Sequence, residues 1–293
     1  MRRVARPRSP YPLLLPFFAA LFVFWGVPLL EGVRMSLESD TLYGPSHFVG
    51  LAHYRALVHD DRFFIGLWNT ARHAVLTIAS IVPIGLGLAL LLRQASEKAR
   101  APIRFCLLLP GLTPPVVLGF LFVLVFSGRH GLLNTAVLEP LGIPALDWLK
   151  DPAVIPVSLV LQAIWRWTGF VTLVLLAGIE GIPRAYVEMA RAEGAGPRAV
   201  FRDVTLPQLR PLLAFCAVML FLDAFVSFAG AYVLLGASGG TSDAGLLLVG
   251  LVYQTAFTYG RFGSAAAMSL SVVPLIALGL FAFLRMRRSE AIE

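Results

Sequence analysis

The sequence has few charged side chains and few cysteines for its length. Only 14% of its 293 residues are Asp, Glu, Lys or Arg, whereas soluble domains carry about 25%. This shortage leaves too little polar surface to cover a water-soluble core. The high apolar content also excludes disorder and a nucleic-acid-binding domain. The two cysteines, Cys106 and Cys216, lie in apolar runs without a CxxC or Cys/His spacing, so the sequence indicates neither a disulfide framework nor a cysteine metal site.

Hydrophobic residues make up 58% of the chain, and the mean hydropathy is +0.79. A helix needs about 20 apolar residues to cross a bilayer, and six segments of about that size hold at most one charged residue. They are Ser9–Leu30, His73–Leu92, Phe105–Gly128, Pro152–Ile179 with Arg166, Pro211–Phe228 with Asp223, and Phe262–Leu284. We therefore predict an all-α membrane protein with six transmembrane helices, the first of which is an uncleaved anchor and not a signal peptide.

The basic residues are concentrated on one side of this six-span arrangement. Four lie before the first span, four in residues 93–104, five in residues 184–210 and three in residues 285–288, out of 24 in total. Because cytoplasmic loops are enriched in Lys and Arg, both termini are predicted to be cytoplasmic. A seventh span at Ala244–Gly260 would move the basic tail outside. We therefore interpret that segment as an external or re-entrant amphipathic helix.

The extramembrane segments are too short to supply a catalytic or energy-converting domain. The longest predicted loops have roughly 30 to 40 residues, which is too few for an independent core. A membrane enzyme would also need convergent acid, base or metal-binding groups. The five histidines show no metal-ligand spacing and lie toward the external side or the span ends; they are His47, His53, His59, His73 and His130. We therefore predict a protein that is not an enzyme and that binds no cofactor itself.

The most informative stretch is the predicted cytoplasmic loop Ile182–Pro211. Good helix formers at Tyr186–Glu193 predict a short helix, which Gly194 and Gly196 can end by adopting positive φ. Pro197 suits the first turn of a second helix, and Pro207 and Pro211 are expected to stop that helix before the chain re-enters the membrane. Two readings remain open: a basic amphipathic loop lying on anionic lipid, or a rigid knob that docks into a cytoplasmic partner.

Within this loop, Glu188-Met189-Ala190, Gly194 and Val204-Thr205-Leu206-Pro207 follow one another at a recognisable spacing. The pattern resembles the EAA loop of the integral membrane subunits of binding-protein-dependent ABC importers, with Met189 and Val204 as departures. In that family the loop contains a coupling helix that sits in a cleft of the ATP-hydrolysing subunit. The resemblance implies that ATPase coupling here involves Glu188, Ala190, Gly194, Ala195, Leu206 and Pro207.

Further stretches resemble the carbohydrate branch of this family, the maltose and glycerol-3-phosphate type. They are Phe48–Tyr54, Asn69-Thr70, Gly131–Asn134, Trp165–Phe170 and Tyr259–Gly263. The resemblance implies a type I importer transmembrane fold in the inner membrane of a bacterium or archaeon. It also implies a second permease subunit, so that the pair is a heterodimer, together with two ATP-binding subunits that hold ATP and Mg²⁺, and a periplasmic or lipid-anchored solute-binding protein.

Asp223 is the clearest candidate for the solute path, because a carboxylate at membrane depth is costly unless it faces a wet cavity or a partner. It shares one predicted helix face with Leu220, Ala224 and Ser227, at spacings of three, four and seven residues from Leu220. Aligned on the loop prolines, this face resembles the fifth-span positions that line the sugar site of maltose-type permeases, and Trp165 falls at an aromatic position of that site. The predicted solute path also includes Phe170 of the aromatic stretch.

Structural roles for the same residues remain open. Asp223 can pair with Arg166 across the fourth and fifth spans, because intramembrane charges usually find partners. Trp165 and Trp167 can belong to an interfacial aromatic belt, and Asn69 can simply cap the second span.

The resemblance divides the chain into residues 1–65 (cytoplasmic segment, first span and external loop), a permease core at 66–284 and a cytoplasmic tail at 285–293. The alternatives are an autonomous channel or ion-driven carrier, or an ABC permease for a solute that is not a sugar. A channel or carrier would need inverted repeats or several intramembrane ionisable groups. The sequence shows no clear repeat, and only Arg166 and Asp223 are strongly charged within the spans.

Overall fold

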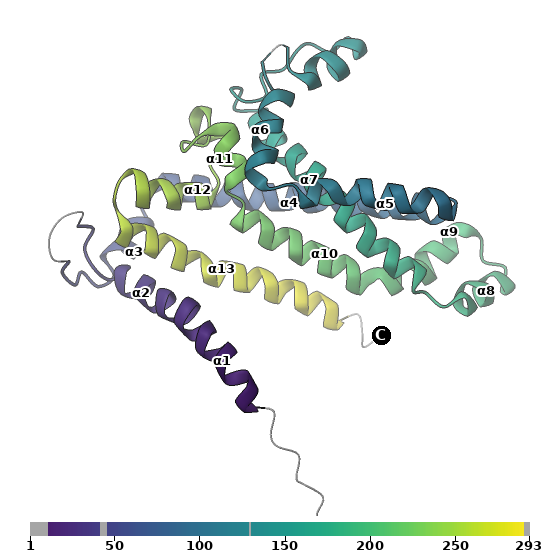
Figure 1. The fold of residues 1–293 in the computed structure, drawn as a ribbon, viewed down its shortest axis with the longest axis horizontal. Helices are drawn as coiled ribbons and strands as arrows, with labels where there is room; N and C mark the ends of the chain where they lie inside the picture. Colours follow the sequence, from purple (N-terminus) through teal and green to yellow (C-terminus); the bar gives the residue numbers. More distant parts are fainter. Residues whose placement is uncertain (1–10, 42–45, 129, 290–293) are drawn as a thin grey trace, which may run out of the picture. The chain divides into compact units, whose positions relative to one another are not determined.

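The computed structural model describes residues 11–41, 46–128 and 130–289 (Figure 1). Within these ranges the regular elements are helices, and the one strand-type pairing is an isolated bridge between Glu38 and Phe48. The predicted all-α architecture is therefore confirmed. Internal contacts distinguish two units. One contains the described residues up to His59 together with Thr255–Val272, and the other contains Asp60–Gln254 with the described residues from Val273 onward.

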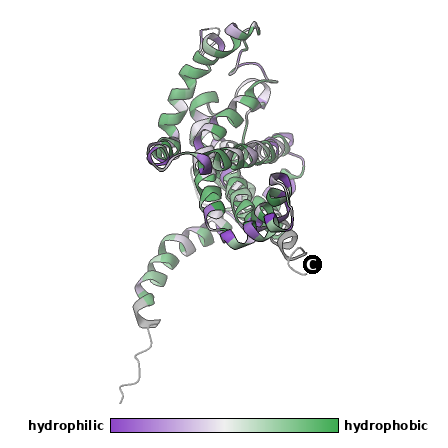
Figure 2. Ribbon diagram, turned by 90° about the vertical axis from the view of Figure 1, so that its right-hand side faces the viewer, coloured by the Kyte–Doolittle hydropathy of each residue, from purple (hydrophilic) through white to green (hydrophobic). Residues whose placement is uncertain are grey.

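Five helical segments of the described chain are long and apolar enough to cross a membrane. They are Leu14–Met35 (α1, Tyr11–Leu21, and α2, Val27–Met35, joined by a π-helical turn), Asp61–Gln94 (α4), Ile155–Glu180 (α7), Pro197–Val226 (ending in α10, Leu206–Val226) and Phe262–Phe281 (within α13, Phe262–Ser289). Figure 2 shows that hydrophobic residues predominate over most of the helical ribbon. They correspond to five of the six predicted spans.

The remaining predicted span, Phe105–Gly128, is not one straight helix. The chain forms α5 (Glu97–Leu112) and α6 (Pro115–Val125), which meet at an angle of 98°. Thr113 and Pro114 between them are extended, with ψ of 129° and 137°. Two consecutive prolines explain the break, because proline disfavours a helical conformation in the residue before it and lacks a backbone N–H. Counted as one bent span, the pair gives a sixth crossing among the described residues.

The second long helix begins earlier than predicted. α4 starts at Asp61, and the Asp60 side chain caps it by accepting hydrogen bonds from the backbone N–H groups of Arg62 (3.0 Å) and Phe63 (3.2 Å). The alternative that Asn69 caps this helix, which the sequence left open, is therefore wrong. Asn69 lies inside α4 and donates through Nδ2 to the carbonyl oxygens of Asp243 (2.9 Å) and Leu246 (3.2 Å), so it fixes the loop before α12.

The predicted amphipathic segment Ala244–Gly260 contains a shorter helix. α12 covers Leu248–Tyr253 and continues as a π-helical turn to Thr258. These residues are apolar but too few to cross a bilayer, which needs about 20. The observed length agrees with a segment that does not span.

The core of the larger unit depends on close helix packing at glycines. α4 packs along α7, and the buried side chains of Ile81, Val171 and Leu175 belong to this interface. α7 also lies against α5, where a Cβ at Gly169 would stand 1.7 Å from the backbone oxygen of Leu107. Small residues permit such close approach between helices in membranes.

We expect Gly169→Ala to destabilise the protein by about 2 kcal/mol, because the added methyl group forces α5 and α7 apart. The matched control is Gly87→Ala in α4, where nothing lies within 4 Å of the added Cβ. That change should raise stability slightly, since alanine favours a helix over glycine by up to about 1 kcal/mol. Thermal unfolding of the two purified variants in detergent measures both effects, and equal melting temperatures would contradict the packing argument.

A polar cluster organises the smaller unit. The carboxylate of Asp40 accepts hydrogen bonds from the backbone N–H (3.0 Å) and the hydroxyl of Ser264, and from Nε of Arg261 (3.3 Å). His53 contacts the carbonyl oxygen of Glu38 at 2.8 Å and the Ser264 hydroxyl at 3.1 Å. Burial alone would raise the pKa of Asp40, but the hydrogen bonds from Ser264, together with His53 and Arg261, hold that pKa below its usual value.

This cluster predicts acid sensitivity in the smaller unit. A carboxylate whose pKa is lowered by folding stabilises the folded state above its unfolded pKa of about 3.9 and loses that contribution as pH falls through the folded value. We expect hydrogen-exchange protection of α3 (Ala52–Leu57) to fall when the pH drops below about 4. In Asp40→Asn the protection should be lower at neutral pH and should not change with pH. A variant that keeps the acid response would show that another group titrates.

Candidate functional site: a polar cavity and a helical elbow

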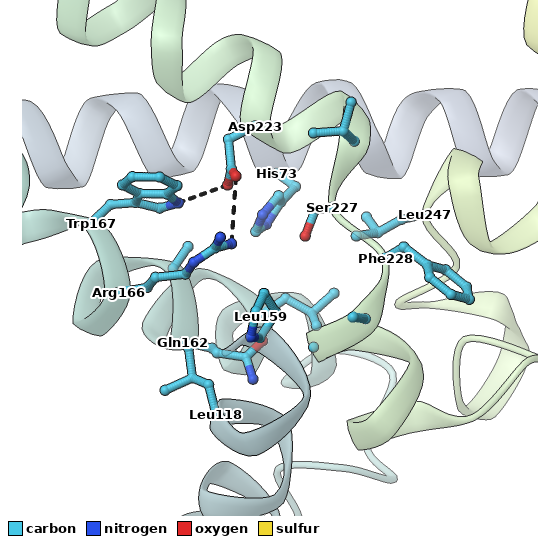
Figure 3. A pocket seen from close by; sticks show the side chains of 15 residues that line it. His73, Leu118, Leu159, Gln162, Arg166, Trp167, Asp223, Ser227, Phe228 and Leu247 are labelled. Atoms are coloured by element: carbon cyan, nitrogen blue, oxygen red, sulfur yellow. Dashed lines mark hydrogen bonds and ion pairs between the residues drawn. The ribbon is translucent and has the colours of Figure 1, made fainter. Parts of the chain in front are cut away.

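A cavity of about 340 Å³ lies in the larger unit among α4, α6, α7 and the end of α10. Figure 3 shows its polar lining: His73 from α4, Gln162, Arg166 and Trp167 from α7, Asp223 from α10, and Ser227 from the segment that leads into α11 (Ala229–Leu235). These residues come from three segments that are far apart in sequence, and the packing of α4 and α10 against α7 brings them together.

Asp223 is held from two sides by α7. Its Oδ2 accepts a hydrogen bond from the indole N–H of Trp167 (2.8 Å), and its Oδ1 lies 3.5 Å from Nη1 of Arg166 (Figure 3). The Arg166 and Asp223 side chains are 23% and 20% exposed, and the guanidinium carbon of Arg166 lies 4.7 Å from the Trp167 ring centroid. The ion pair that the sequence left open is therefore present, and it lines a cavity.

Several polar atoms around the cavity lack hydrogen-bond partners among the described residues. They include Nδ1 of His73, Nε2 of Gln162 and Nε of Arg166. The His73 and Gln162 side chains are more than nine-tenths buried. Buried polar groups without partners are costly unless water or a ligand satisfies them. The site is therefore suited to a polar molecule that can both donate and accept hydrogen bonds.

Two of the six predicted solute-path residues, Asp223 and Ser227, line this cavity. The predicted continuous helix face is wrong at its end, because α10 stops at Val226 and Ser227 is extended. Leu220 and Ala224 are buried in helix packing, and Trp165 is 57% exposed. Phe170 packs edge to face against Trp167, with ring centroids 5.9 Å apart.

Sequence reasoning did not assign His73, Gln162, Arg166 or Trp167 to the solute path. The available signal was polarity, because Gln162 and Arg166 interrupt an otherwise apolar segment and His73 stands at the start of another. The pairing of helices that gathers them around one space could not be read from the sequence.

In the predicted EAA loop the chain bends sharply between two short helices, α8 (Arg184–Ala192) and α9 (Pro197–Ala199). We call this pair of helices the elbow. α8 ends in a Schellman motif, in which the N–H of Gly194 donates to the carbonyl of Arg191 and the N–H of Ala195 donates to the carbonyl of Ala190, both at 3.0 Å. Gly194 has a φ of +88°, as predicted for a helix-ending glycine. Gly196 does not share this role, because its φ is −72°. Glu188 and Gly194 are exposed on the elbow.

Beyond the elbow, the predicted stop at Pro207 and Pro211 is wrong. The chain runs from α9 (Pro197–Ala199) through a π-helical turn (Val200–Thr205) directly into α10. Leu206 and Pro207 therefore occupy the first turn of α10, and Pro211 lies inside it. The π turn contains Asp203, whose carbonyl would meet the Pro207 ring in a regular α-helix, and its wider winding relieves that clash.

Comparison with known families identifies this architecture. The profile of the family described as "Binding-protein-dependent transport system inner membrane component" matches residues 81–289. The chain belongs to this family. It is therefore a multi-pass membrane subunit of an ABC transport system, and the resemblance drawn from the elbow and its flanking segments is confirmed.

Individual relatives extend over nearly the whole chain. The arabinooligosaccharide permease AraP of Bacillus subtilis is 32% identical, over 94% of this chain and 89% of its own length. The trehalose/maltose permease MalF of Thermococcus litoralis is 28% identical, over 95% and 93%. Among solved structures, a chain of a bacterial ABC transporter that imports the acidic polysaccharide alginate superposes with a TM-score of 0.81 at 22% identity, over 95% and 94%. The last comparison shows a shared fold.

Proposed function

We propose that this chain is a permease subunit of a carbohydrate importer and that the cavity around Asp223 and Arg166 contacts the solute during translocation. The names of its relatives support a carbohydrate class, since they specify arabinooligosaccharides, trehalose or maltose, and sulfoquinovosyl glycerol. These proteins differ in solute, so the proposal is limited to a sugar or a related polyol.

The observation that carries the proposal is the composition of the cavity. A sugar ring presents hydroxyl groups that both donate and accept hydrogen bonds, together with an apolar face. Asp223 and Ser227 can accept hydrogen bonds, Arg166 and Gln162 can donate, and Trp167 and Phe228 offer aromatic surface. Polar groups held inside an apolar bundle are the usual mark of a solute path in membrane proteins.

The elbow supports a second part of the proposal. The coupling surface consists of α8 and its cap, with Glu188, Ala190, Gly194 and Ala195. The first turn of α10, with Leu206 and Pro207, joins the elbow to the rest of that helix. Two ATP-binding subunits that hold ATP and Mg²⁺ would pull on this surface. Because Asp223 lies on α10 itself, movement of the elbow would be transmitted along the helix to the cavity.

The remaining partners follow from the family. A second permease subunit of different sequence would complete the translocation path, and a periplasmic or lipid-anchored solute-binding protein would deliver the sugar. We place the assembly in the cytoplasmic membrane of a bacterium or archaeon, with both termini and the elbow on the cytoplasmic side. The permease core would comprise residues 66–284.

The proposal can be tested by co-purification followed by uptake measurements. Affinity-tagged chain, expressed with its neighbouring genes, should be isolated with an ATP-binding subunit and a second permease. The complex in proteoliposomes should then take up sugar only with its solute-binding protein and internal ATP. Isolation of this chain alone with ion conductance would instead favour a channel or carrier. A solute-binding protein that binds no carbohydrate would favour a permease for another solute class.

A further inference from the structure

A second concave surface lies at the elbow, away from the central cavity. It is a groove of about 660 Å³ between the end of α4 and the elbow, and we call it the basic groove. Its charged residues are Arg93 from α4, Arg191 from α8 and Arg198 from α9, and its apolar floor includes Leu90, Val187 and Phe201. The proposed transport mechanism does not use this surface.

The three arginines differ from Arg104 and Arg202, which form ion pairs with carboxylates. Arg104 pairs with Glu180 at 2.9 Å, and Arg202 pairs with Asp203 at 2.7 Å. Among the described residues, no carboxylate pairs with Arg93, Arg191 or Arg198. The groove therefore concentrates three uncompensated guanidinium groups, which favour a phosphate because their planar N–H groups match its oxygens.

The basic groove is separate from the surface proposed to couple to the ATPase. Val187 and Arg191, one turn apart on α8, line the groove, whereas Glu188, Ala190 and Gly194 do not. Exposed Glu188 and Glu193 give the coupling surface acidic side chains. A protein partner can therefore hold the elbow by that surface while the groove receives a different occupant.

The surroundings of the groove favour lipid. α4 is a membrane-spanning helix that ends at Gln94, and Arg93 and Gln94 lie in its last turn beside the groove. Basic pockets between transmembrane helices at the cytoplasmic surface bind the headgroups of anionic lipids. The combination of three arginines with an apolar floor matches a phosphate that is attached to acyl chains better than a free, fully hydrated anion.

We propose that the basic groove binds the headgroup of an anionic phospholipid, such as phosphatidylglycerol or cardiolipin. The bound phosphate joins the end of α4 to the elbow, because Arg93 comes from one and Arg191 and Arg198 from the other. Such a link stiffens the elbow against the bundle, and transport then depends on membrane lipid composition. This inference goes beyond the proposed function and does not depend on which solute is carried.

The test compares the complete transporter in nanodiscs of phosphatidylcholine alone and of phosphatidylcholine mixed equally with phosphatidylglycerol. Retained lipid is counted by native mass spectrometry. A juxtamembrane basic residue strengthens anionic-lipid binding by about fivefold. We therefore expect the triple variant Arg93→Gln, Arg191→Gln, Arg198→Gln to bind phosphatidylglycerol about a hundredfold more weakly.

Two further variants control for charge and folding. Arg184→Gln, Arg202→Gln, Arg210→Gln removes three arginines from the same loop that do not line the groove, and it should retain the lipid. A triple Arg→Lys change at the groove keeps the charge but loses the planar guanidinium groups. It should bind phosphatidylglycerol less tightly than the wild type and more tightly than the Gln variant, which controls for misfolding of the Gln variant. Glycerol phosphate should not displace the lipid from the wild-type complex.

Equal phosphatidylglycerol binding by the two Gln triple variants would overturn the proposal. Displacement by glycerol phosphate would overturn the assignment to lipid and indicate a site for a soluble phosphate ester. Loss of the ATP-binding subunit from the groove variant with unchanged lipid binding would identify the groove as a protein contact. None of these outcomes depends on sugar uptake, so failure here is distinguishable from failure of the proposed function.

Discussion

Replacing Gly194 with proline is expected to reduce solute uptake to background while the permease still inserts into the membrane. Gly194 has a φ of +88° and donates its N–H to Arg191 within the helix cap. Proline fixes φ near −65° and has no N–H, so the cap cannot form, at a cost of roughly 3 kcal/mol. The elbow would then lose its shape, and nucleotide-driven movement would not reach α10. Uptake and ATP hydrolysis by the reconstituted complex measure this uncoupling.

A matched pair of valine variants isolates the backbone effect. A Cβ at Gly194 or at Gly196 would have nothing within 4 Å, so a side chain at either position meets no steric clash. Gly196 has a φ of −72°, which valine adopts easily, whereas the φ of Gly194 is strained for valine. Gly194→Val should therefore lose most uptake and Gly196→Val should keep it. Equal uptake by the two variants would show that the shape of the elbow is unimportant.

The second large effect is expected at the central ion pair. Asp223→Ala leaves Arg166 and the indole N–H of Trp167 without their carboxylate partner inside the bundle. Removal of one member of a largely buried pair costs about 3–5 kcal/mol, because the other charge remains desolvated. We expect a clearly lower melting temperature for the purified complex, together with loss of uptake.

A neutral double variant separates stability from transport. Arg166→Gln with Asp223→Asn removes both charges and should restore the melting temperature close to that of the wild type, since replacement of a whole buried pair is often nearly neutral. Uptake should stay low, because the cavity has lost its charged groups. Asp203→Ala serves as a control, since its ion pair with Arg202 is exposed and contributes little. Normal uptake by the double variant would mean that the pair is structural and does not contact solute.

The helices could be predicted from the sequence because the bilayer imposes a length and a composition on them. Apolar segments of about 20 residues located five of the spans, and Gly194 and Pro197 located the end of one elbow helix and the start of the next. Hydropathy did not reveal the bend between α5 and α6, since Thr113, Pro114 and Pro115 lie inside an apolar run. The two consecutive prolines contained that information, but a search for long apolar segments with few charges does not use it.

The helix end predicted from prolines on the other side of the elbow was also wrong. Pro207 and Pro211 were expected to stop a helix, yet the π-helical turn at Val200–Thr205 lets one helical run continue into the membrane. The spacing of prolines in the sequence does not predict such a turn. The cavity could be predicted only in part, for a different reason. Asp223 is recognisable in the sequence as a charge in an apolar segment. The placement of His73 and Gln162 beside it depends on how α4, α7 and α10 pack.

In the proposed function, a separate ATP-driven subunit binds the elbow and moves the helices around the cavity. The most direct test places a photo-reactive amino acid at Met189, which is 58% exposed on α8 beside the proposed coupling residues. After illumination of the assembled complex in membranes, we predict an adduct with the ATP-binding subunit whose yield changes when ATP is added. An adduct with lipid alone, or labelling of this position from outside the cell, would contradict ATPase coupling through the elbow.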